Sequence, residues 1–109
     1  MNWINLQDQQ QIARITELSC TRPQVIFKHS TRCAVSSMAM NRLERETQPT
    51  ETDFYFLDLI AHRNISNKIS ERLNVYHESP QVILIKNGEC IYYESHMGIS
   101  MDDLAEQAV

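Results

Sequence analysis

Residues 27–37 read FKHSTRCAVSS, and they indicate a strand that runs directly into a helix. Phe27, together with Val25 and Ile26 just before it, favours a short buried strand. Beyond a polar turn, Val35, Ala39 and Leu43 recur every four residues, which predicts an amphipathic helix. Cys33 therefore falls where a buried strand ends and a helix begins, and ligands of open α/β sheets bind at this end of the strands.

Helical and strand patterns alternate along the whole chain. The expected elements are, in order, a helix at about 8–19, a strand at 24–29, a helix after 30–32, a strand at 54–60, a helix capped by Asn64, a strand at 82–85, a turn at 87–88, a strand at 90–94 and a helix that begins at Ser100. This order combines parallel βαβ units with a terminal hairpin and helix. It predicts an α/β fold, a thioredoxin-like three-layer α/β/α sandwich whose mixed sheet has about four strands with flanking helices. We expect a single domain over residues 1–109.

The composition argues against several classes of protein. With 42% hydrophobic residues, the chain can bury a core without disulfides or metal. Its net charge of −4 argues against DNA or RNA as the main partner, because phosphate binding needs a basic surface. No apolar run approaches the roughly 20 residues of a membrane helix, and the polar N-terminus does not resemble a signal peptide. The three cysteines therefore indicate free thiols in a reducing cytoplasm.

Cys33 is the candidate nucleophile. Only a thiolate attacks a disulfide, and the unpaired N–H groups and positive dipole end of a helix N-terminus stabilise an anion. Arg32 adds a positive charge beside the sulfur, and Ser36, three residues on, could donate its hydroxyl proton to it. The alternative is an ordinary buried cysteine, but a residue beside a polar turn is expected to be at least partly exposed.

Ser36 also decides the type of exchange. A dithiol oxidoreductase resolves its mixed disulfide with a second cysteine three residues on, and a serine hydroxyl cannot form a disulfide. The sequence therefore predicts a monothiol mechanism, in which the mixed disulfide at Cys33 persists until an external thiol arrives. Cys20 and Cys90 lack a helix-start context, so we expect them to take no part unless they move into disulfide range.

Pro80 precedes the strand at 82–85, within the segment HESPQ. In a thioredoxin-like fold, a cis-proline at this point lies against the active-site cysteine, and the main chain of the preceding residue pairs with the incoming substrate. We therefore expect a cis peptide bond between Ser79 and Pro80, with Ser79 contacting substrate through its main chain. The alternative is a proline that only starts a strand, since about 5–6% of X–Pro bonds in folded proteins are cis.

Three separated segments carry a family resemblance: residues 28–39 (KHSTRCAVSSMA), 77–82 (HESPQV) and 95–100 (SHMGIS). Together they resemble the YtxJ family of monothiol bacilliredoxins, over about residues 27–100. The resemblance implies a thioredoxin-like fold and a cytoplasmic thiol–disulfide oxidoreductase that removes bacillithiol from S-thiolated proteins. It also implies bacillithiol as a co-substrate and no cofactor.

Within this resemblance, Cys33 takes the place of the nucleophile, Ser36 that of the resolving residue and Pro80 that of the cis-proline. Many relatives have proline directly after the cysteine, where this chain has Ala34. The difference is expected to adjust the redox poise without removing the chemistry. Because bacillithiol carries a malate group, we hypothesise that Arg32 both favours the thiolate and steers the acidic end of the thiol. The alternative is a solvated surface arginine.

The candidate substrate contacts flank the nucleophile, the proline and the last loop; they are Thr31, Ala34, Ser79, Pro80 and Gly98. His96 is expected to border the site from the same loop as Gly98. No pair of the four histidines has the usual ligand spacing, so no metal site is expected. His29 is expected to be hydrogen-bonded at the end of its strand rather than catalytic.

Two other functions stay open at this point. A monothiol thioredoxin-fold protein can hold an iron–sulfur cluster between two subunits, with one cysteine from each plus an external thiol. The fold can also serve as an interaction module without catalysis. The expected partners are S-thiolated proteins and a low-molecular-weight thiol, with no nucleic acid and no membrane, and the chain is expected to be a monomer or a weak dimer.

Overall fold

The computed structural model describes residues 1–109 and contains one five-stranded mixed sheet, in the strand order β1-β3-β2-β4-β5. The strands are β1 Trp3–Asn5, β2 Gln24–His29, β3 Asp53–Asp58, β4 Gln81–Lys86 and β5 Glu89–Ser95. The helices are α1 Gln10–Leu18, α2 Ala34–Glu44, α3 Arg63–Leu73 and α4 Met101–Gln107, with a 3₁₀ turn, η1 His96–Gly98, between β5 and α4. None of these helices has the length and hydropathy that a bilayer span needs.

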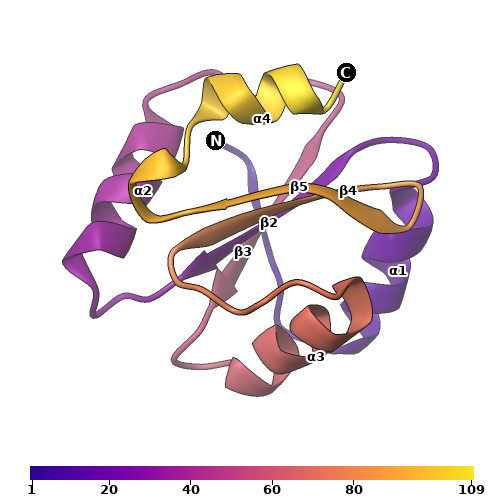
Figure 1. Cartoon of the computed structure of the whole chain (residues 1–109), viewed down its shortest axis with the longest axis horizontal. Helices are drawn as coiled ribbons and strands as arrows, with labels where there is room; N and C mark the ends of the chain where they lie inside the picture. Colours follow the sequence, from indigo (N-terminus) through magenta and orange to yellow (C-terminus); the bar gives the residue numbers. More distant parts are fainter.

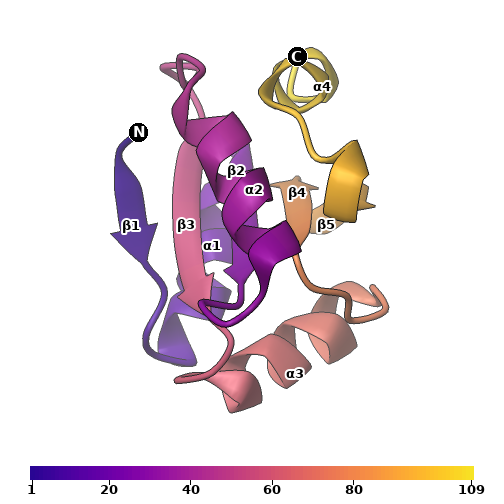
Figure 2. The ribbon, with the colours of Figure 1, turned by 90° about the vertical axis from the view of Figure 1, so that its left-hand side faces the viewer.

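Helices cover both faces of the sheet (Figures 1 and 2). One apolar cluster joins the sheet to α1 and α3, and a second joins it to α2 and α4. The central strands β2 and β4 are buried along almost their whole length because both of their faces are covered. The expected three-layer α/β/α sandwich is therefore present.

The sheet has one strand more than the expected four or so, because residues 3–5 add an edge strand. β1 pairs in parallel with β3, with Trp3 opposite Phe54, and the indole of Trp3 stacks on Phe27 at a centroid distance of 5.6 Å. A strand of three residues with one neighbour carries too short a pattern to be recognised in the sequence. The first helix then begins at Gln10 rather than at residue 8.

The α2 helix turns a different row of side chains towards the core from the expected one. Val35 is 36% exposed, whereas Ser36 is 0% exposed and lies on the same inward face as Ala39 and Leu43. The rows 35-39-43 and 36-39-43 both have helical spacing, so the sequence pattern does not distinguish them. The serine at the resolving position therefore lies inside the protein.

The other boundaries shift by a few residues. β3 ends at Asp58 rather than Ile60, because the Asp58 carboxylate accepts the Ile60 N–H at 3.0 Å and turns the chain. The cap position of α3 is His62, not Asn64. The predicted cap of α4 is confirmed, since the hydroxyl of Ser100 accepts the backbone N–H three residues on at 3.1 Å.

Candidate active site

Four elements meet at one edge of the sheet (Figure 2). β2 and β3 end at this edge, β4 begins there, and α2 starts there after a short turn. Lys28 pairs with Gln81 across the antiparallel strands, so the next residues, His29 and Pro80, lie level with each other. The turn that leads to Cys33 therefore starts beside Pro80.

Cys33 occupies the N-cap position of α2, with φ −110° and ψ 120°. Its thiol is free, partly exposed and not hydrogen-bonded. Its N–H donates to the carbonyl of Ser30 at 3.1 Å, and its C=O accepts the first helical bond, from Ser37, at 3.1 Å. The next three N–H groups have no acceptor within the chain. The sulfur therefore lies at the positive end of α2 and open to solvent, which does not fit a sealed structural cysteine.

The Ser36 hydroxyl makes no hydrogen bond to the sulfur of Cys33, contrary to expectation. Its Oγ lies 2.7 Å from Nδ1 of His29 and accepts the N–H of Ser30 at 3.0 Å. Both partners lie on the inner side of the helix, one at the end of β2 and one in the turn. The hydroxyl therefore ties the helix to the turn instead of donating to a thiolate.

His29 is 5% exposed, and the rings of Phe27 and Phe56 lie at centroid distances of 5.6 and 5.4 Å from its own. Burial lowers the pKa of His29 below its ordinary value, although the nearby Asp58 carboxylate acts in the opposite direction. The imidazole is therefore neutral at neutral pH, and one of its ring nitrogens can accept a hydrogen bond. The expected hydrogen bond of His29 at its strand end is confirmed.

The side chains around the sulfur are exposed, and they belong to Thr31, Arg32 and Ala34. The two ion pairs of the structure lie elsewhere, and Arg32 makes no hydrogen bond within the chain. Arg32, which directly precedes the candidate nucleophile in the sequence, therefore carries an uncommitted cation.

The peptide bond between Ser79 and Pro80 is cis, as expected. Pro80 is buried, and its carbonyl accepts the N–H of His96 at 3.0 Å, which brings η1 to the same edge of the sheet. The main-chain N–H and C=O of Ser79 make no hydrogen bond within the chain. Both groups are therefore free to pair with an extended segment of another molecule.

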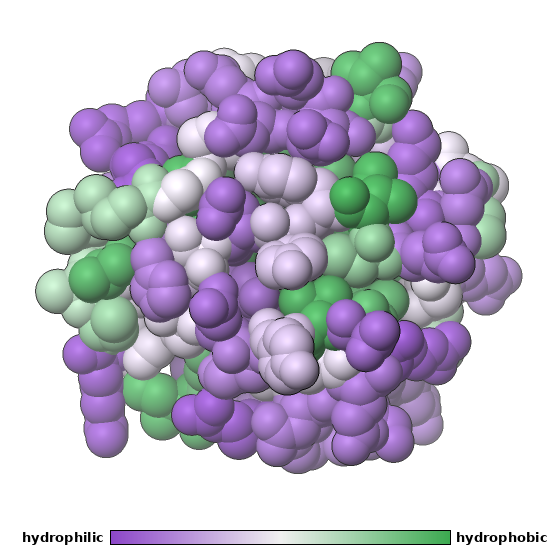
Figure 3. Space-filling view, viewed as in Figure 1, coloured by the Kyte–Doolittle hydropathy of each residue, from purple (hydrophilic) through white to green (hydrophobic).

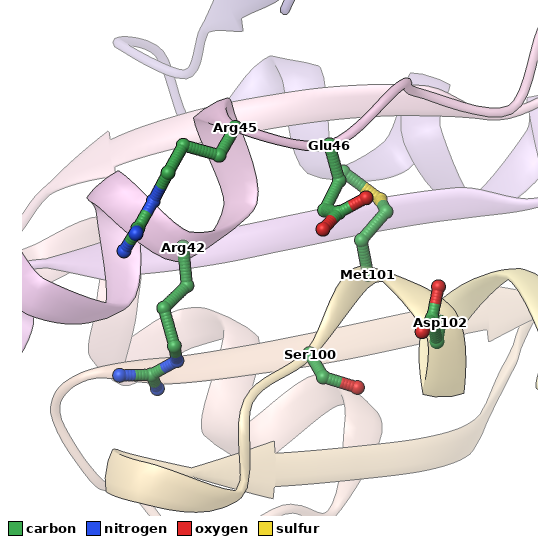
Figure 4. Close-up of a pocket in the computed structure, with 6 residues that line it drawn as sticks. All are labelled: Arg42, Arg45, Glu46, Ser100, Met101 and Asp102. Carbon is green, nitrogen blue, oxygen red and sulfur yellow. The ribbon is translucent and has the colours of Figure 1, made fainter.

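Arg42 joins α2 to the segment that follows β5. Its guanidinium donates to the carbonyls of His96 at 2.9 Å and Ile99 at 3.2 Å, and Figure 4 shows the side chain extending from α2 towards this segment. Helical spacing puts Arg42 among the outward-facing charges of its helix, so the sequence does not reveal this contact. The contact fixes η1 relative to α2.

Gly98 is exposed at the end of η1, where the side chain of Glu94 lies against it. A Cβ at this position would come within 2.6 Å of the Glu94 Cδ atom. The same carboxylate accepts the N–H of Ser95 at 2.9 Å, and the Ser95 hydroxyl donates to Glu78, just before the cis-proline. The η1 segment is therefore connected to the proline loop as well as to α2.

Sequence reasoning also missed a buried cation on the α3 face of the sheet. Lys28 is 0% exposed, and its Nζ donates to Ser70 Oγ at 3.2 Å and lies 3.3 Å from Nδ1 of His77. No carboxylate lies within ion-pair distance of it. Burial, together with the charge of Arg63, lowers the pKa of Lys28 to about 8. Burial also lowers the pKa of His77, and Lys28 and Arg63 lower it further.

Cys33 lies on an open edge of the protein and lines none of its main hollows. The pocket of Figure 4, of about 310 Å³, lies between the C-terminal half of α2 and the start of α4. One of its lining residues, Arg42, is roughly 13 Å along the helix from Cys33, at about 1.5 Å per residue.

The exposed apolar residues Val35, Met38 and Met97 lie on α2 and η1, and Figure 3 shows hydrophobic side chains gathered over these elements. An open, partly apolar surface can accept a macromolecule.

The other two cysteines lie at the opposite end of the sheet. Cys90 pairs with Ile85, which pairs with Gln24 at the start of β2. The end of β2 lies five residues further on, or roughly 16 Å at about 3.3 Å per residue. Cys20 lies between α1 and the start of β2, at the same far end, and burial raises the pKa of the Cys90 thiol. Neither thiol is near Cys33 in the folded chain.

Several solved structures share this fold. A structure described as a candidate oxidoreductase with a thioredoxin fold is 29% identical, with a TM-score of 0.79, and the match covers 95% of this chain and 91% of that one. Thioredoxin from Malassezia sympodialis is 16% identical, with a TM-score of 0.79 and coverage of 99% and 92%. Thioredoxin from Fasciola hepatica is 18% identical, with a TM-score of 0.71 and coverage of 95% and 94%. The two thioredoxins show likeness of fold alone.

The family described as monothiol bacilliredoxin BrxC matches residues 4–104, almost the whole chain. This match confirms the resemblance to the YtxJ family, and it includes the segments that carry Cys33 and Pro80. The protein is thus a thioredoxin-fold thiol oxidoreductase. The chain belongs to the monothiol bacilliredoxin BrxC family.

Proposed function

We propose that this protein removes bacillithiol, or a similar low-molecular-weight thiol, from S-thiolated proteins through Cys33. The observation that carries the proposal is the position of Cys33, a free and partly exposed thiol at the N-cap of α2 with three unpaired N–H groups beyond it. Such a position places the sulfur at the positive end of the helix and leaves it accessible to a disulfide on another protein.

The exchange has two steps. The Cys33 thiolate attacks the bacillithiol sulfur of the mixed disulfide, forms a new S–S bond, and releases the substrate cysteine as a thiolate that takes a proton from solvent. A second bacillithiol thiolate then attacks the bacillithiol sulfur bound to Cys33. This step releases Cys33 as a thiolate and yields bacillithiol disulfide, so the cycle consumes one free bacillithiol for each substrate cysteine that it releases.

The distance of Cys20 and Cys90 from Cys33 supports a monothiol mechanism. A resolving thiol must come within disulfide range of Cys33, and Cys20 and Cys90 lie at the far end of the sheet. The external thiol therefore completes the cycle. A reducing cytoplasm supplies such a thiol, and we propose that the protein acts there as a monomer or weak dimer, on protein substrates and not on nucleic acid or membranes.

Neighbouring groups offer contacts for both parts of the substrate. The unpaired main chain of Ser79 can pair with the polypeptide that carries the disulfide. The uncommitted guanidinium of Arg32 can receive the malate carboxylates of bacillithiol. Thr31, Ala34 and Gly98 are exposed on the same edge and complete the proposed contact surface with Pro80.

Mass spectrometry of protein treated with bacillithiol disulfide tests this function. A variant that lacks Cys20 and Cys90 removes adducts at other thiols, since Cys20 is exposed. In that background we expect one bacillithiol adduct on the peptide that contains Cys33, reversed by added bacillithiol, and no adduct after Cys33→Ser. The proposal is rejected if Cys33 stays unmodified, or if the adducted protein does not exchange with bacillithiol.

A further inference from the structure

We propose that His29 is a positioning residue for Cys33 and acts on it through Ser36. The proposal rests on Cys33 as the reacting thiol, and it assigns a role to a buried histidine that does not touch the substrate. A continuous series of hydrogen bonds leads from the imidazole to the main chain of the nucleophile.

The hydrogen-bond series begins at the ring. Nδ1 of His29 lies 2.7 Å from Ser36 Oγ, and the same oxygen accepts the N–H of Ser30 at 3.0 Å. The carbonyl of Ser30 in turn accepts the N–H of Cys33 at 3.1 Å. Ser30 is therefore held at both its N–H and its C=O, and the turn that presents the sulfur has both of its ends fixed.

Counting protons decides the direction of the first bond. A serine hydroxyl has one proton to donate, and the N–H of Ser30 already occupies an acceptor position on the Ser36 oxygen. The only group within hydrogen-bond distance that could accept this proton is Nδ1 of His29. The neutral imidazole therefore carries its proton on Nε2 and accepts at Nδ1, which directs the Ser36 proton into the interior and away from the sulfur.

The surroundings keep this arrangement rigid. The rings of Phe27 and Phe56 lie close to the imidazole, and the carbonyl of His29 accepts the N–H of Leu59 at 3.0 Å. Ser36 has no exposed surface, so a substrate cannot reach its hydroxyl. The His29–Ser36 pair therefore does not form a nucleophilic serine dyad, and its effect must pass through the turn.

The tautomer of His29 in the unmodified protein is the first test. Nitrogen-15 NMR of the ring at neutral pH should show a protonated Nε2 and an unprotonated Nδ1. A protonated Nδ1 would overturn the proposal. This measurement needs no variant, so a failure of a substituted chain to fold cannot leave the proposal untested.

Variants then test the coupling to Cys33. His29→Leu and Ser36→Ala should each expose the amide of Ser30 to hydrogen exchange and slow the reaction of Cys33 with bacillithiol disulfide by about fivefold, as for the loss of one buried hydrogen bond. The double variant should be no slower than Ser36→Ala alone, because both substitutions interrupt the same series. His29→Asn, which can place an amide oxygen near the position of Nδ1, should restore both the protection and the rate.

Ser37→Ala is the matched control, because Ser37 is the exposed neighbour of Ser36 and should leave exchange and rate unchanged. Additive losses in the double variant, or an unchanged rate in His29→Leu, would show that the histidine only fills space. A Cys33 adduct that still forms in these variants keeps the proposed function intact, so the two proposals fail separately.

Discussion

Arg42 Nη2 lies 2.9 Å from the carbonyl oxygen of His96, and this bond joins the α2 helix to the loop that faces the cis-proline. Its Nε binds a second carbonyl of the same segment, that of Ile99, at 3.2 Å. Because Pro80 accepts the N–H of His96, the α2 helix, the η1 turn and the proline loop are held together around one arginine.

Arg42→Met should lower the free energy of unfolding by about 1–2 kcal/mol, because it keeps the apolar stem of the side chain and removes both hydrogen bonds. Urea denaturation measures the change. Arg45→Met is the matched control, since the guanidinium of Arg45 binds only Asn41 of its own helix. Equal losses in the two variants would mean that the contact between α2 and η1 contributes no stability.

Gly98→Ala should lower the free energy of unfolding by about 1 kcal/mol, because the new methyl group displaces the Glu94 side chain and breaks its bond to the N–H of Ser95. The displaced group is the end of a flexible side chain, which keeps the cost small. In a Glu94→Ala background, the same substitution should cost nothing. A double-mutant cycle by urea denaturation checks this, and full additivity of the two changes would contradict it.

The pKa of Lys28, lowered to about 8, predicts an unusual dependence of stability on pH. Between about pH 8 and the ordinary lysine pKa of about 10.4, the unfolded chain keeps a proton that the folded chain has released. Unfolding then takes up a proton, so the free energy of unfolding rises with pH over this range. Below pH 8 both states hold the proton, so Lys28 no longer makes the free energy of unfolding depend on pH.

Denaturation at pH 7.5 and 9.5 should therefore show a contribution from Lys28 of about 2 kcal/mol in favour of the higher pH. Lys28→Met is expected to lack this contribution. Tyr55 and Cys90, whose pKa values burial raises, act in the opposite direction at high pH but are present in both proteins, so the difference between the two profiles isolates the lysine. Profiles that run parallel would contradict the lowered pKa.

The sequence predicts those parts of the site whose positions depend only on neighbouring residues in the chain. Cys33 follows a strand and starts a helix within a few residues, and Pro80 stands directly before a strand, so both can be placed from short patterns. The contacts that it misses span the chain: Arg42 and Ile99 are 57 residues apart, and Lys28 and His77 are 49 apart. The hydrophobic periodicity of a segment predicts its own secondary structure but not which distant residue will contact it in the fold.

Ser36 is an intermediate case. Its place at the resolving position follows from counting residues, but its burial depends on the rotation of α2 against the sheet. The rows 35-39-43 and 36-39-43 both have helical spacing, so the sequence pattern does not fix this rotation. In the structure, the row that includes Ser36 faces the core. The error at Val35 and the unexpected partner of Ser36 therefore have one cause.

Ser36→Cys should convert the monothiol site into a dithiol site. Residues three apart on a helix lie about 5–6 Å apart between Cβ atoms, so a small adjustment brings two sulfurs into disulfide range. After reaction with bacillithiol disulfide, mass spectrometry should find an intramolecular disulfide and no lasting adduct in a background without Cys20 and Cys90. A stable adduct on Cys33 in this variant would mean that the buried thiol cannot reach it.

Arg32→Gln should slow the reaction of Cys33 with bacillithiol disulfide more than its reaction with 2-hydroxyethyl disulfide. Arg32 is exposed and makes no internal ion pair, so its charge is available to the malate carboxylates, whereas a neutral disulfide offers it no partner. Stopped-flow rates at low ionic strength should differ by a few-fold between the two substrates, and added salt should reduce the difference because it screens exposed charges. Equal slowing of both reactions would leave Arg32 with an effect on the thiolate alone and would exclude steering of the substrate.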